Sequence, residues 1–174
     1  VDCLRREHVG RYGAKFPWED GTVISPTPNL DKLSKEMILF DRAYAPSPLT
    51  LLSIPSMFTG KYLAIEEPIP DLTLPKLLKE NGYHTMCVQI ELLDKYDLGF
   101  DVSYRMVGDG GVRTFATTNA LKKYEGEKPI FLWIHYFDLH TPYILRPKHN
   151  YDGDLINPGW GKKSLINLYN SQIY

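Results

Sequence analysis

The spacing of hydrophobic residues changes repeatedly along this chain, and the changes predict an alternation of helices and strands. Leu30, Leu33 and Met37 recur at helical intervals, so we expect a short helix, capped by Asn29, that turns these side chains inward. Helical signals also cover residues 50–58, 73–82 and 114–124.

Strands are predicted where apolar residues run together or alternate with polar ones. Residues 39–44 alternate and predict a short strand, and residues 84–90 predict a buried one. The run Ile130–Ile134 is wholly apolar, which is typical of a central parallel strand covered on both faces. Residues 10–28 are rich in glycine and proline and predict a long loop.

Helices and strands in alternation indicate an α/β fold with a mostly parallel central sheet and helices on both faces. In such a sheet ligands bind at the carboxyl ends of the strands, so functional residues are expected there. Pro55 conflicts with the predicted helix over residues 50–58, because proline lacks an N–H and its ring crowds the preceding turn. We expect Pro55 to lie in the first turn or to kink the helix.

The composition excludes several classes of protein. The chain has 174 residues, enough for one domain with a hydrophobic core, and its 20 basic residues balance 21 acidic ones. This balance argues against a nucleic-acid or membrane-surface binder, and a hydrophobic content of 43% excludes a disordered chain. No apolar run approaches the ~20 residues of a membrane span. Cys3 and Cys87 make neither a disulfide framework nor a metal cluster, and we expect both to be buried.

The two ends of the sequence favour a part of a longer protein. The chain opens without a methionine, and a helical pattern that begins at Ser164 still runs at Tyr174. No signal-peptide pattern opens the sequence, which leans toward a cytoplasmic location, although any export signal would precede residue 1.

Two residues near predicted element ends carry oxygen atoms suited to chemistry. Asp2 would lie at the carboxyl end of a strand if Val1 ends one, and its carboxylate could bind a metal there; the alternative is an aspartate in a turn. Thr50 falls where a loop becomes a helix. Its hydroxyl is either an N-cap or a nucleophile beside the partial positive charge that attracts phosphate or sulfate.

A third candidate follows the apolar strand over residues 130–134. This segment holds His135, Asp138 and His140, and in an extended chain the last two would point the same way. Imidazole suits either a proton donor at neutral pH or a metal ligand, so His140 is a candidate for both roles.

Six motifs in this order resemble the sulfatase family of the alkaline-phosphatase superfamily. They include an early Gly-x-Tyr-Gly, a Thr-Pro-Asn-Leu-Asp-x-Leu helix start, a Gly-Tyr-x-Thr and a strand that ends in His-Thr-Pro-Tyr. The resemblance implies that residues 1–174 are the N-terminal portion of a single sulfatase-like α/β catalytic domain. The matching segments are residues 1–13, 27–33, 40–44, 47–60, 82–85 and 129–143.

The resemblance also implies roles for three residues. Asp2 matches the first metal-binding aspartate of the family. Thr50, nine residues before the Thr59 of a Thr-Gly pair, matches the nucleophile, which also touches the metal. His140 matches the histidine that protonates the leaving oxygen or contacts the transferred group. The remaining ligands, an Asp followed by His or Asn, would come later than Tyr174.

The nucleophile segment departs from the sulfatases proper, which carry Cys or Ser followed by x-Pro-x-Arg. That Cys or Ser becomes formylglycine, whereas oxidation of Thr50 would give a ketone, and the arginine is missing. Residues 53–56, Ser-Ile-Pro-Ser, mimic the motif but lie three residues too near the Thr-Gly pair. Relatives that transfer phosphoryl groups use an unmodified Thr or Ser, which Thr50 fits better. The Lys-x-His of the family is also absent, since residues 88–91 are Val-Gln-Ile-Glu.

We therefore expect a metal-dependent hydrolase of sulfate or phosphate esters that uses a hydroxyl nucleophile on a small-molecule or carbohydrate ester. Two alternatives stay open: a phosphotransferase or phosphatase of the same superfamily, and a degenerate member that binds a ligand without turnover. An all-oxygen site favours Ca²⁺ or Mg²⁺, and one richer in histidine favours Zn²⁺ or Mn²⁺. The balanced charge gives no reason to expect a nucleic-acid partner, and nothing in the sequence indicates an oligomeric state.

Overall fold

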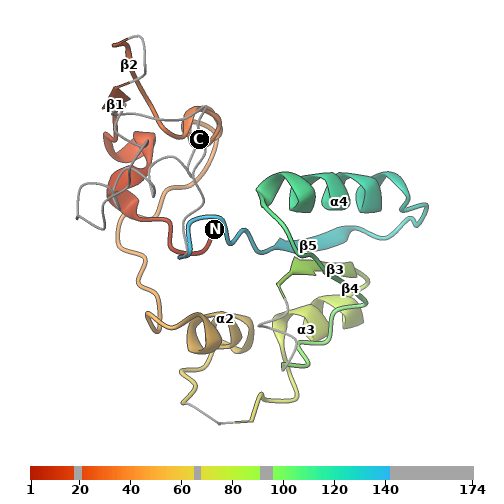
Figure 1. The fold of residues 1–174 in the computed structure, drawn as a ribbon. Helices are drawn as coiled ribbons and strands as arrows, with labels where there is room; N and C mark the ends of the chain where they lie inside the picture. Colours follow the sequence, from red (N-terminus) through yellow and green to blue (C-terminus); the bar gives the residue numbers. More distant parts are fainter. Residues whose placement is uncertain (18–20, 65–67, 91–95, 142–174) are drawn as a thin grey trace. The chain divides into compact units, whose positions relative to one another are not determined.

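The computed structural model describes residues 1–17, 21–64, 68–90 and 96–141, which form two compact units (Figure 1). Unit 1 holds residues 1–42 and the chain from Phe137 onward, and unit 2 holds residues 43–136. The features of the sequence that lie outside the described residues are Glu91, Pro142, Tyr143 and the predicted helix from Ser164 to Tyr174.

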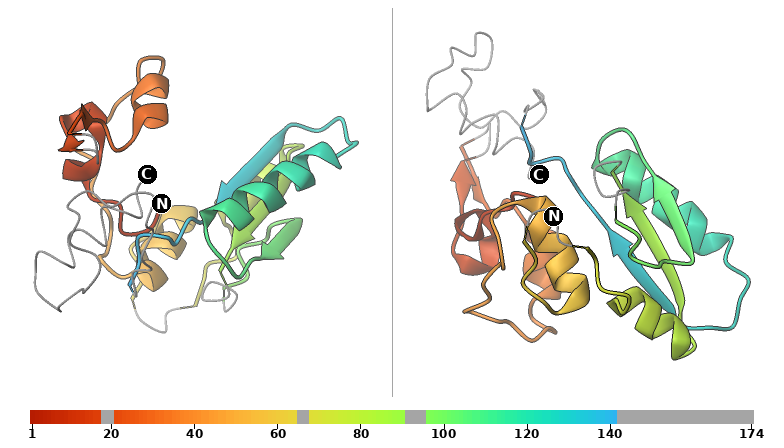
Figure 2. Two further views of the ribbon diagram at one scale, coloured as in Figure 1. Left: turned by 45° about the horizontal axis from the view of Figure 1, so that its top comes forward. Right: turned by 90° about the horizontal axis from the view of Figure 1, so that it is seen from below.

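A three-stranded parallel sheet forms the centre of unit 2. β3 (His84–Gln89) lies between β4 (Val102–Arg105) and β5 (Ile130–Ile134), and both neighbours run parallel to it (Figure 2). The predicted parallel sheet is therefore confirmed. The central position expected for β5 is wrong within the described residues, where β5 is an edge strand with half-buried side chains and β3 is the buried one. An apolar run indicates burial, but it does not say which strand has two neighbours.

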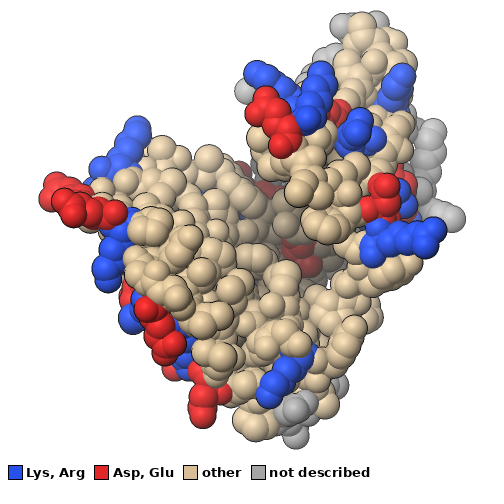
Figure 3. Space-filling model, turned by 180° about the vertical axis from the view of Figure 1, so that it is seen from behind, with Lys and Arg blue, Asp and Glu red and all other residues tan. Residues whose placement is uncertain are grey.

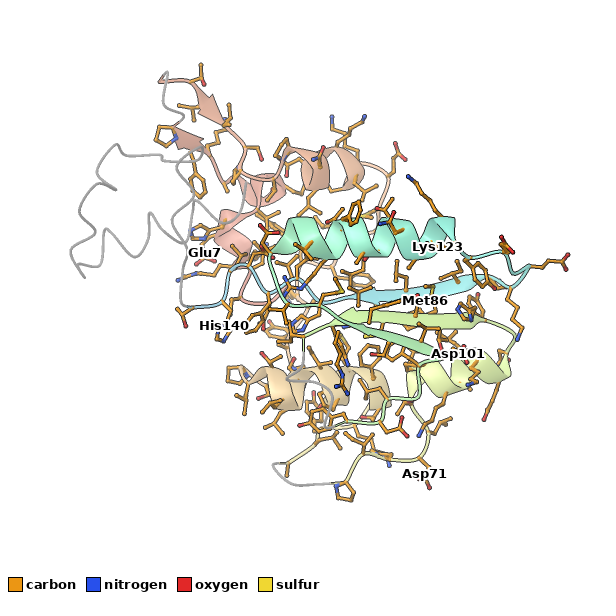
Figure 4. All side chains as sticks on the ribbon, turned by 45° about the vertical axis from the view of Figure 1, so that its right-hand side comes forward. Glu7, Asp71, Met86, Asp101, Lys123 and His140 are labelled. Carbon is orange, nitrogen blue, oxygen red and sulfur yellow. The ribbon has the colours of Figure 1, made fainter. Side chains whose placement is uncertain are left out.

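Helices cover both faces of this sheet, as the sequence predicted. α4 (Gly110–Lys122) lies on one face, and α2 (Thr50–Thr59) and α3 (Leu74–Glu80) lie on the other (Figure 4). The three helical spans expected in this part of the chain are thus present, with shifts of a few residues at their ends. We call the side of the sheet that carries α2 and α3 the α2 face.

Side-chain caps explain where two of these helices begin. The Asp109 carboxylate accepts a hydrogen bond from the Val112 N–H at 3.1 Å, so α4 starts a turn earlier than its apolar pattern predicted. The Thr73 hydroxyl accepts from the Lys76 N–H at 3.4 Å at the start of α3, as expected. The predicted stop of α3 is also confirmed, since Gly82 follows it with a φ of 87° that favours glycine.

Phe58 fixes α2 on the sheet. Its ring meets Trp133 of β5 edge-on at 5.0 Å between centroids and meets Phe100 edge-on at 5.6 Å. Ile54 and Leu98 are buried in the same cluster. Such aromatic pairs each add roughly 0.5–1.5 kcal/mol beyond the burial of their area, so the second half of α2 is firmly anchored.

A carboxylate holds the edge at which the strands begin. Asp101, which directly precedes β4, accepts hydrogen bonds from the Thr85 N–H at 2.9 Å and from the Thr85 hydroxyl at 3.1 Å (Figure 4). The Lys79 ammonium lies 2.6 Å from the other carboxylate oxygen, and only 20% of the Asp101 side chain is exposed. The hydrogen bond from Lys79, followed by that from the Thr85 N–H, lowers the pKa of Asp101 to about 2.

Unit 1 consists of short elements. Two turns of 3₁₀-helix, η1 (Arg6–His8) and η2 (Gly10–Tyr12), precede a small antiparallel pair formed by β1 (Phe16–Pro17) and β2 (Val23–Ile24). α1 (Pro28–Leu33) follows. The stretch predicted as one long loop therefore contains a 3₁₀ turn and a strand pair, which are too short to produce a periodic pattern.

A polar network, which we call the Asp31 latch, ties η2 to α1. Thr27, and not Asn29 as predicted, precedes the helix. The Thr27 hydroxyl accepts the Gly10 N–H at 2.8 Å and donates to one oxygen of Asp31 at 3.1 Å. The Ser25 hydroxyl donates to the other Asp31 oxygen. The Thr and Asp of the Thr-Pro-Asn-Leu-Asp motif thus have a structural role.

Two further expectations for the early chain are wrong. Leu30, Leu33 and Met37 are exposed instead of turned inward, and residues 39–44 form no strand in the described structure. The apolar spacing identified which face of α1 could be buried, but it supplied no partner for that face. A strand likewise needs a neighbouring strand for its backbone hydrogen bonds, and no described strand pairs with residues 39–44.

Asp101→Asn should lower the free energy of unfolding by about 1–3 kcal/mol at pH 7, because it removes the ion pair with Lys79 and weakens the acceptor for Thr85. The pKa of Asp101 is about 2 in the folded protein, below its ordinary 3.8. The contribution of Asp101 to the free energy of unfolding is therefore complete above pH 3.8 and is lost as the pH falls toward 2. The difference between wild type and variant in urea unfolding should shrink over that range. Glu80→Gln, at an exposed position of α3, is the matched control. An equal loss of unfolding free energy in that variant would contradict the role given to Asp101.

Gly10→Ala should loosen unit 1, because the added methyl group would overlap the Ser25 hydroxyl and the Asp31 carboxylate of the latch. We expect a cost of about 1–3 kcal/mol, the range for overpacking a tight site. Amide hydrogen exchange of peptides that span η2 and α1 measures the effect. Lys32→Ala, an exposed change on α1, should leave exchange unaltered. If exchange in Gly10→Ala is as slow as in the wild type, the Asp31 latch does not constrain this position.

Candidate active site

Two buried polar side chains stand at the carboxyl ends of the strands, where parallel sheets bind ligands. Gln89 ends β3 and His135 directly follows β5, and they are 7% and 3% exposed. The backbone N–H of His135 donates to the Val88 carbonyl at 2.8 Å, so the parallel pairing of β5 with β3 continues through His135. Gln89 lies outside the six motifs, whereas His135 lies in the matching segment 129–143, in which sequence reasoning favoured His140. The position of His135 directly after the apolar strand made it a candidate, but its burial beside Gln89 leaves no local signal in the sequence.

Both side chains lie on the α2 face. Side chains alternate along a strand, so His135 faces the same way as Trp133, and their ring centroids are 6.5 Å apart. The pairing of Cys87 with Trp133 puts Gln89 beside His135 on that face. The Cys87 thiol donates to the Gln89 side-chain oxygen at 3.2 Å. Two buried polar side chains therefore lie side by side on the α2 face, at the edge where the strands end.

α2 begins at this same edge. Tyr96 follows β3 along the chain, and its hydroxyl donates to the Leu51 carbonyl in the first turn of α2 at 2.5 Å. Phe100, which precedes β4, packs against Phe58 in the last turn. Because the chain from Tyr96 to Phe100 returns from the strand ends to the strand starts, α2 runs antiparallel to the strands. Its amino-terminal turn therefore lies at the carboxyl edge.

Thr50 is the first residue of this helix, and it is half-buried. Leu49 is the cap: its carbonyl accepts the N–H groups of Leu52 at 3.0 Å and Ser53 at 2.9 Å. The alternative that Thr50 serves as the N-cap is therefore wrong. A hydroxyl at this position stands at the amino-terminal end of the helix, where the partial positive charge of the helix dipole attracts anions. Ser53, from the segment that mimics the sulfatase motif, lies a full turn further inside.

The start of α4 lies over the end of β5 on the opposite face. The Thr114 hydroxyl and the Tyr136 hydroxyl are hydrogen-bonded at 2.9 Å. Arg113, the preceding residue, is 4% exposed and adds a fixed positive charge to the buried part of unit 2. Sequence reasoning missed Arg113, because a single arginine inside a helical span carries no signal of burial.

His140 lies in a bend and not in the extended segment expected for residues 138–140. Asp138 and Leu139 form a turn, the His140 N–H donates to the Phe137 carbonyl at 3.2 Å, and the two rings stack at 4.2 Å. The His140 Nδ1 lies 2.6 Å from the Thr141 carbonyl, which can only accept, so Nδ1 carries a proton. Nε2 is then the nitrogen available for acid or base chemistry, and it donates a proton only when the ring is positively charged.

Asp2 lies in a turn, and residues 1–4 contain no strand, so the strand end considered for Asp2 is absent from the described structure. Cys3 adopts a φ of 57°, which is uncommon for a residue other than glycine, and its thiol donates to an Asp2 oxygen at 3.5 Å. Cys3 is exposed, contrary to expectation, whereas Cys87 is buried as expected. The Asp2 carboxylate is half-buried.

The predicted site residues fall in different units. Asp2 and His140 belong to unit 1 and Thr50 belongs to unit 2, so their convergence stays a prediction. Among the described residues, no group of three or more His, Cys, Asp or Glu side chains could hold a metal ion. In the part of the chain that the structure describes, no helix has both the length and the apolar character to cross a bilayer. Basic and acidic side chains of unit 2 lie mainly along the outer margin of the visible face, with the two signs mixed, and most of the rest of that face is uncharged (Figure 3).

Known proteins resemble this chain in sequence and in fold. A curated relative, the N-acetylglucosamine-6-O-sulfatase of Bacteroides thetaiotaomicron, is 27% identical over an alignment of 156 positions. The aligned part covers 71% of this chain and 28% of the relative. The lipoteichoic acid synthase LtaP of Listeria monocytogenes aligns with a TM-score of 0.63 at 20% identity, over 86% of this chain and 43% of LtaP. The C-terminal periplasmic domain of EcEptC from Escherichia coli, solved in complex with Zn, aligns with a TM-score of 0.66 at 20% identity, over 99% of this chain and 53% of that domain.

The two solved structures confirm the predicted fold class, an α/β domain of the alkaline-phosphatase type. This chain spans about a quarter of the curated relative's length and about half of each solved chain. The family model described as Sulfatase matches residues 4–171, so it includes Thr50 and His140 and begins two residues after Asp2. The expected resemblance is confirmed, and the chain belongs to the Sulfatase family.

Proposed function

We propose that this protein is a metal-dependent hydrolase of sulfate or phosphate esters in which the Thr50 hydroxyl is the nucleophile. The observation that carries the proposal is the place of Thr50, at the first residue of α2 and at the carboxyl edge of a parallel sheet in a Sulfatase-family chain. We take residues 1–174 as the N-terminal portion of a single catalytic domain. The curated relative acts on a sugar sulfate, as its name states, which supports a carbohydrate or other small-molecule ester as substrate.

The proposed reaction is an in-line displacement at sulfur or phosphorus. The Thr50 hydroxyl gives its proton to solvent as its oxygen forms the new bond to sulfur or phosphorus, while the bond to the alcohol oxygen breaks on the opposite side. The charge on the remaining oxygens is stabilised by the amino-terminal turn of α2. A positively charged His140 gives the proton on Nε2 to the leaving alkoxide. A water oxygen then bonds to the sulfur or phosphorus as the bond to Thr50 breaks, and its two protons return to the Thr50 oxygen and to His140.

The donor atoms at the predicted ligand positions suit a hard divalent cation. Asp2 supplies carboxylate oxygens and Thr50 a hydroxyl oxygen, the ligand types that Ca²⁺ and Mg²⁺ prefer, with Zn²⁺ or Mn²⁺ as the alternatives. Because the described residues hold no group of three ligands, we propose that the rest of the catalytic domain completes the site. When bound there, such a cation lowers the pKa of a hydroxyl that touches it.

A transferase is the second candidate. Two observations favour it: the unmodified threonine at the nucleophile position, and the fold shared with LtaP, which is named a synthase. In that case an acceptor alcohol, and not water, takes the group from Thr50. Parallel assays of the full-length protein with p-nitrophenyl sulfate and p-nitrophenyl phosphate, with and without glycerol as acceptor, separate the candidates by the ratio of released nitrophenol to free anion.

Thr50→Ala should reduce kcat on the preferred nitrophenyl ester by at least about a thousandfold, because the attacking oxygen is removed while the helix remains. Thr50→Ser keeps a hydroxyl and should stay within about tenfold of the wild type. Circular dichroism checks that all three proteins are folded. Undiminished turnover in the alanine variant would leave Thr50 a structural residue only.

Asp2→Asn should weaken metal binding by at least about tenfold, because an amide oxygen carries no charge for the cation. The measurement is metal content by elemental analysis after dialysis against a limiting concentration of each cation. Glu7→Gln, which removes an exposed carboxylate from the same unit, is the control. Identical metal content in the wild type and in Asp2→Asn would remove Asp2 from the set of ligands.

A further inference from the structure

Pro55 leaves one carbonyl of α2 without its usual partner. In an α-helix the N–H of each residue donates to the carbonyl four residues earlier, so the residue that would serve the Leu51 carbonyl is Pro55, which has no N–H. Pro55 is fully buried in the sixth position of the helix, so of the two expectations, the first turn or a kink, the first is wrong. Its ring also crowds the Leu51 carbonyl, which favours tilting of that group away from the helix axis.

Tyr96 supplies the missing hydrogen bond. Its hydroxyl donates to the Leu51 carbonyl at 2.5 Å, across 45 residues of sequence. The ring is half-buried and packs against the cluster of Ile54, Phe58 and Leu98, which holds the phenol in place. Without the tyrosine hydroxyl the part-buried Leu51 carbonyl would lose this donor, which costs free energy and favours loosening of the first turn.

The Leu51 carbonyl lies in the same turn of α2 as Thr50, the proposed nucleophile. Thr50 is the residue directly before Leu51, and the packing of Phe58 anchors only the other end of α2. An unpartnered Leu51 carbonyl would let the first turn unwind without disturbing that anchor. A shift of 1 Å at a reacting atom can cost about a hundredfold in rate.

We propose that Tyr96 is a positioning residue, which holds Thr50 in place through the Leu51 carbonyl that Pro55 leaves unserved. The inference rests on the proposed function, since it assigns a role toward the Thr50 hydroxyl. It goes beyond that function because it links Pro55, which lacks the N–H for the Leu51 carbonyl, with Tyr96, which supplies the replacement donor. A helix with an alanine at position 55 has its own donor for Leu51 and does not need the tyrosine hydroxyl.

A double-mutant cycle tests the pair. Tyr96→Phe should lower kcat on the nitrophenyl ester by about ten- to a hundredfold and leave KM within about twofold, because the orientation of the nucleophile is lost and not the binding of the ester. Pro55→Ala restores an N–H for the Leu51 carbonyl, so Tyr96→Phe in the Pro55→Ala background should cost less than about threefold.

Tyr124→Phe is the matched control. The Tyr124 hydroxyl also donates to a backbone carbonyl, that of Lys128, at 3.2 Å, and its ring stacks on His84 at the start of β3, away from Thr50. This variant should keep the wild-type kcat. Equal losses in Tyr96→Phe and Tyr124→Phe, or an unchanged kcat in Tyr96→Phe, would overturn the proposal.

Hydrogen exchange distinguishes failure of this inference from failure of the proposed function. The amides of Ser53 and Ile54 should exchange at least about tenfold faster in Tyr96→Phe than in the wild type, and should return toward the wild-type rate when Pro55→Ala is added. If the wild type turns over neither ester but exchange follows this cycle, the proposed function fails and the pairing of Tyr96 with Pro55 stands as a structural device. If exchange does not follow the cycle while the wild type is active, the positioning role of Tyr96 fails alone.

Discussion

The edge-on contact of Phe58 with Trp133 and Phe100 is the interaction on which the rest of unit 2 depends. It joins α2 to the parallel sheet and fixes the direction of the helix, so that the first turn comes to the edge where the strands end. An aromatic cluster suits this task because it buries a large area at little cost in side-chain entropy and prefers a defined angle between rings. The polar part of the unit is arranged around that anchor.

The two edges of the sheet differ in chemistry. At the edge where the strands begin, Asp101 uses its charge to join Thr85 and Lys79, and its lowered pKa reflects a carboxylate whose hydrogen bonds are well satisfied. At the other edge, where α2 begins, the two buried polar side chains on the α2 face are Gln89 and His135, and neither is a carboxylate. An anion is repelled by a carboxylate and attracted by N–H groups, so the second edge is the one suited to a sulfate or phosphate ester.

Membership of the Sulfatase family defines the fold of this chain more closely than it defines the reaction. The chain lacks the Cys or Ser with a following arginine that the sulfatases proper carry, and it places an unmodified threonine where α2 begins. The same helix tolerates Pro55 because a tyrosine from another segment replaces the missing backbone donor. Both features concern the amino-terminal half of α2, which is one of the places where this protein departs from a sulfatase of the usual kind.

The sequence by itself determined the α/β class, the parallel sheet, the spans of the helices in unit 2 and the stop of α3, because spacing and capping residues are local signals. It did not predict the strand pair of unit 1, the exposure of Leu30, the edge position of β5, or the burial of His135 and Arg113. Each of these depends on which segment, distant in sequence, lies opposite. Only the tertiary structure decided that Tyr96 meets Leu51, since a hydroxyl and a carbonyl 45 residues apart leave no local pattern in a sequence.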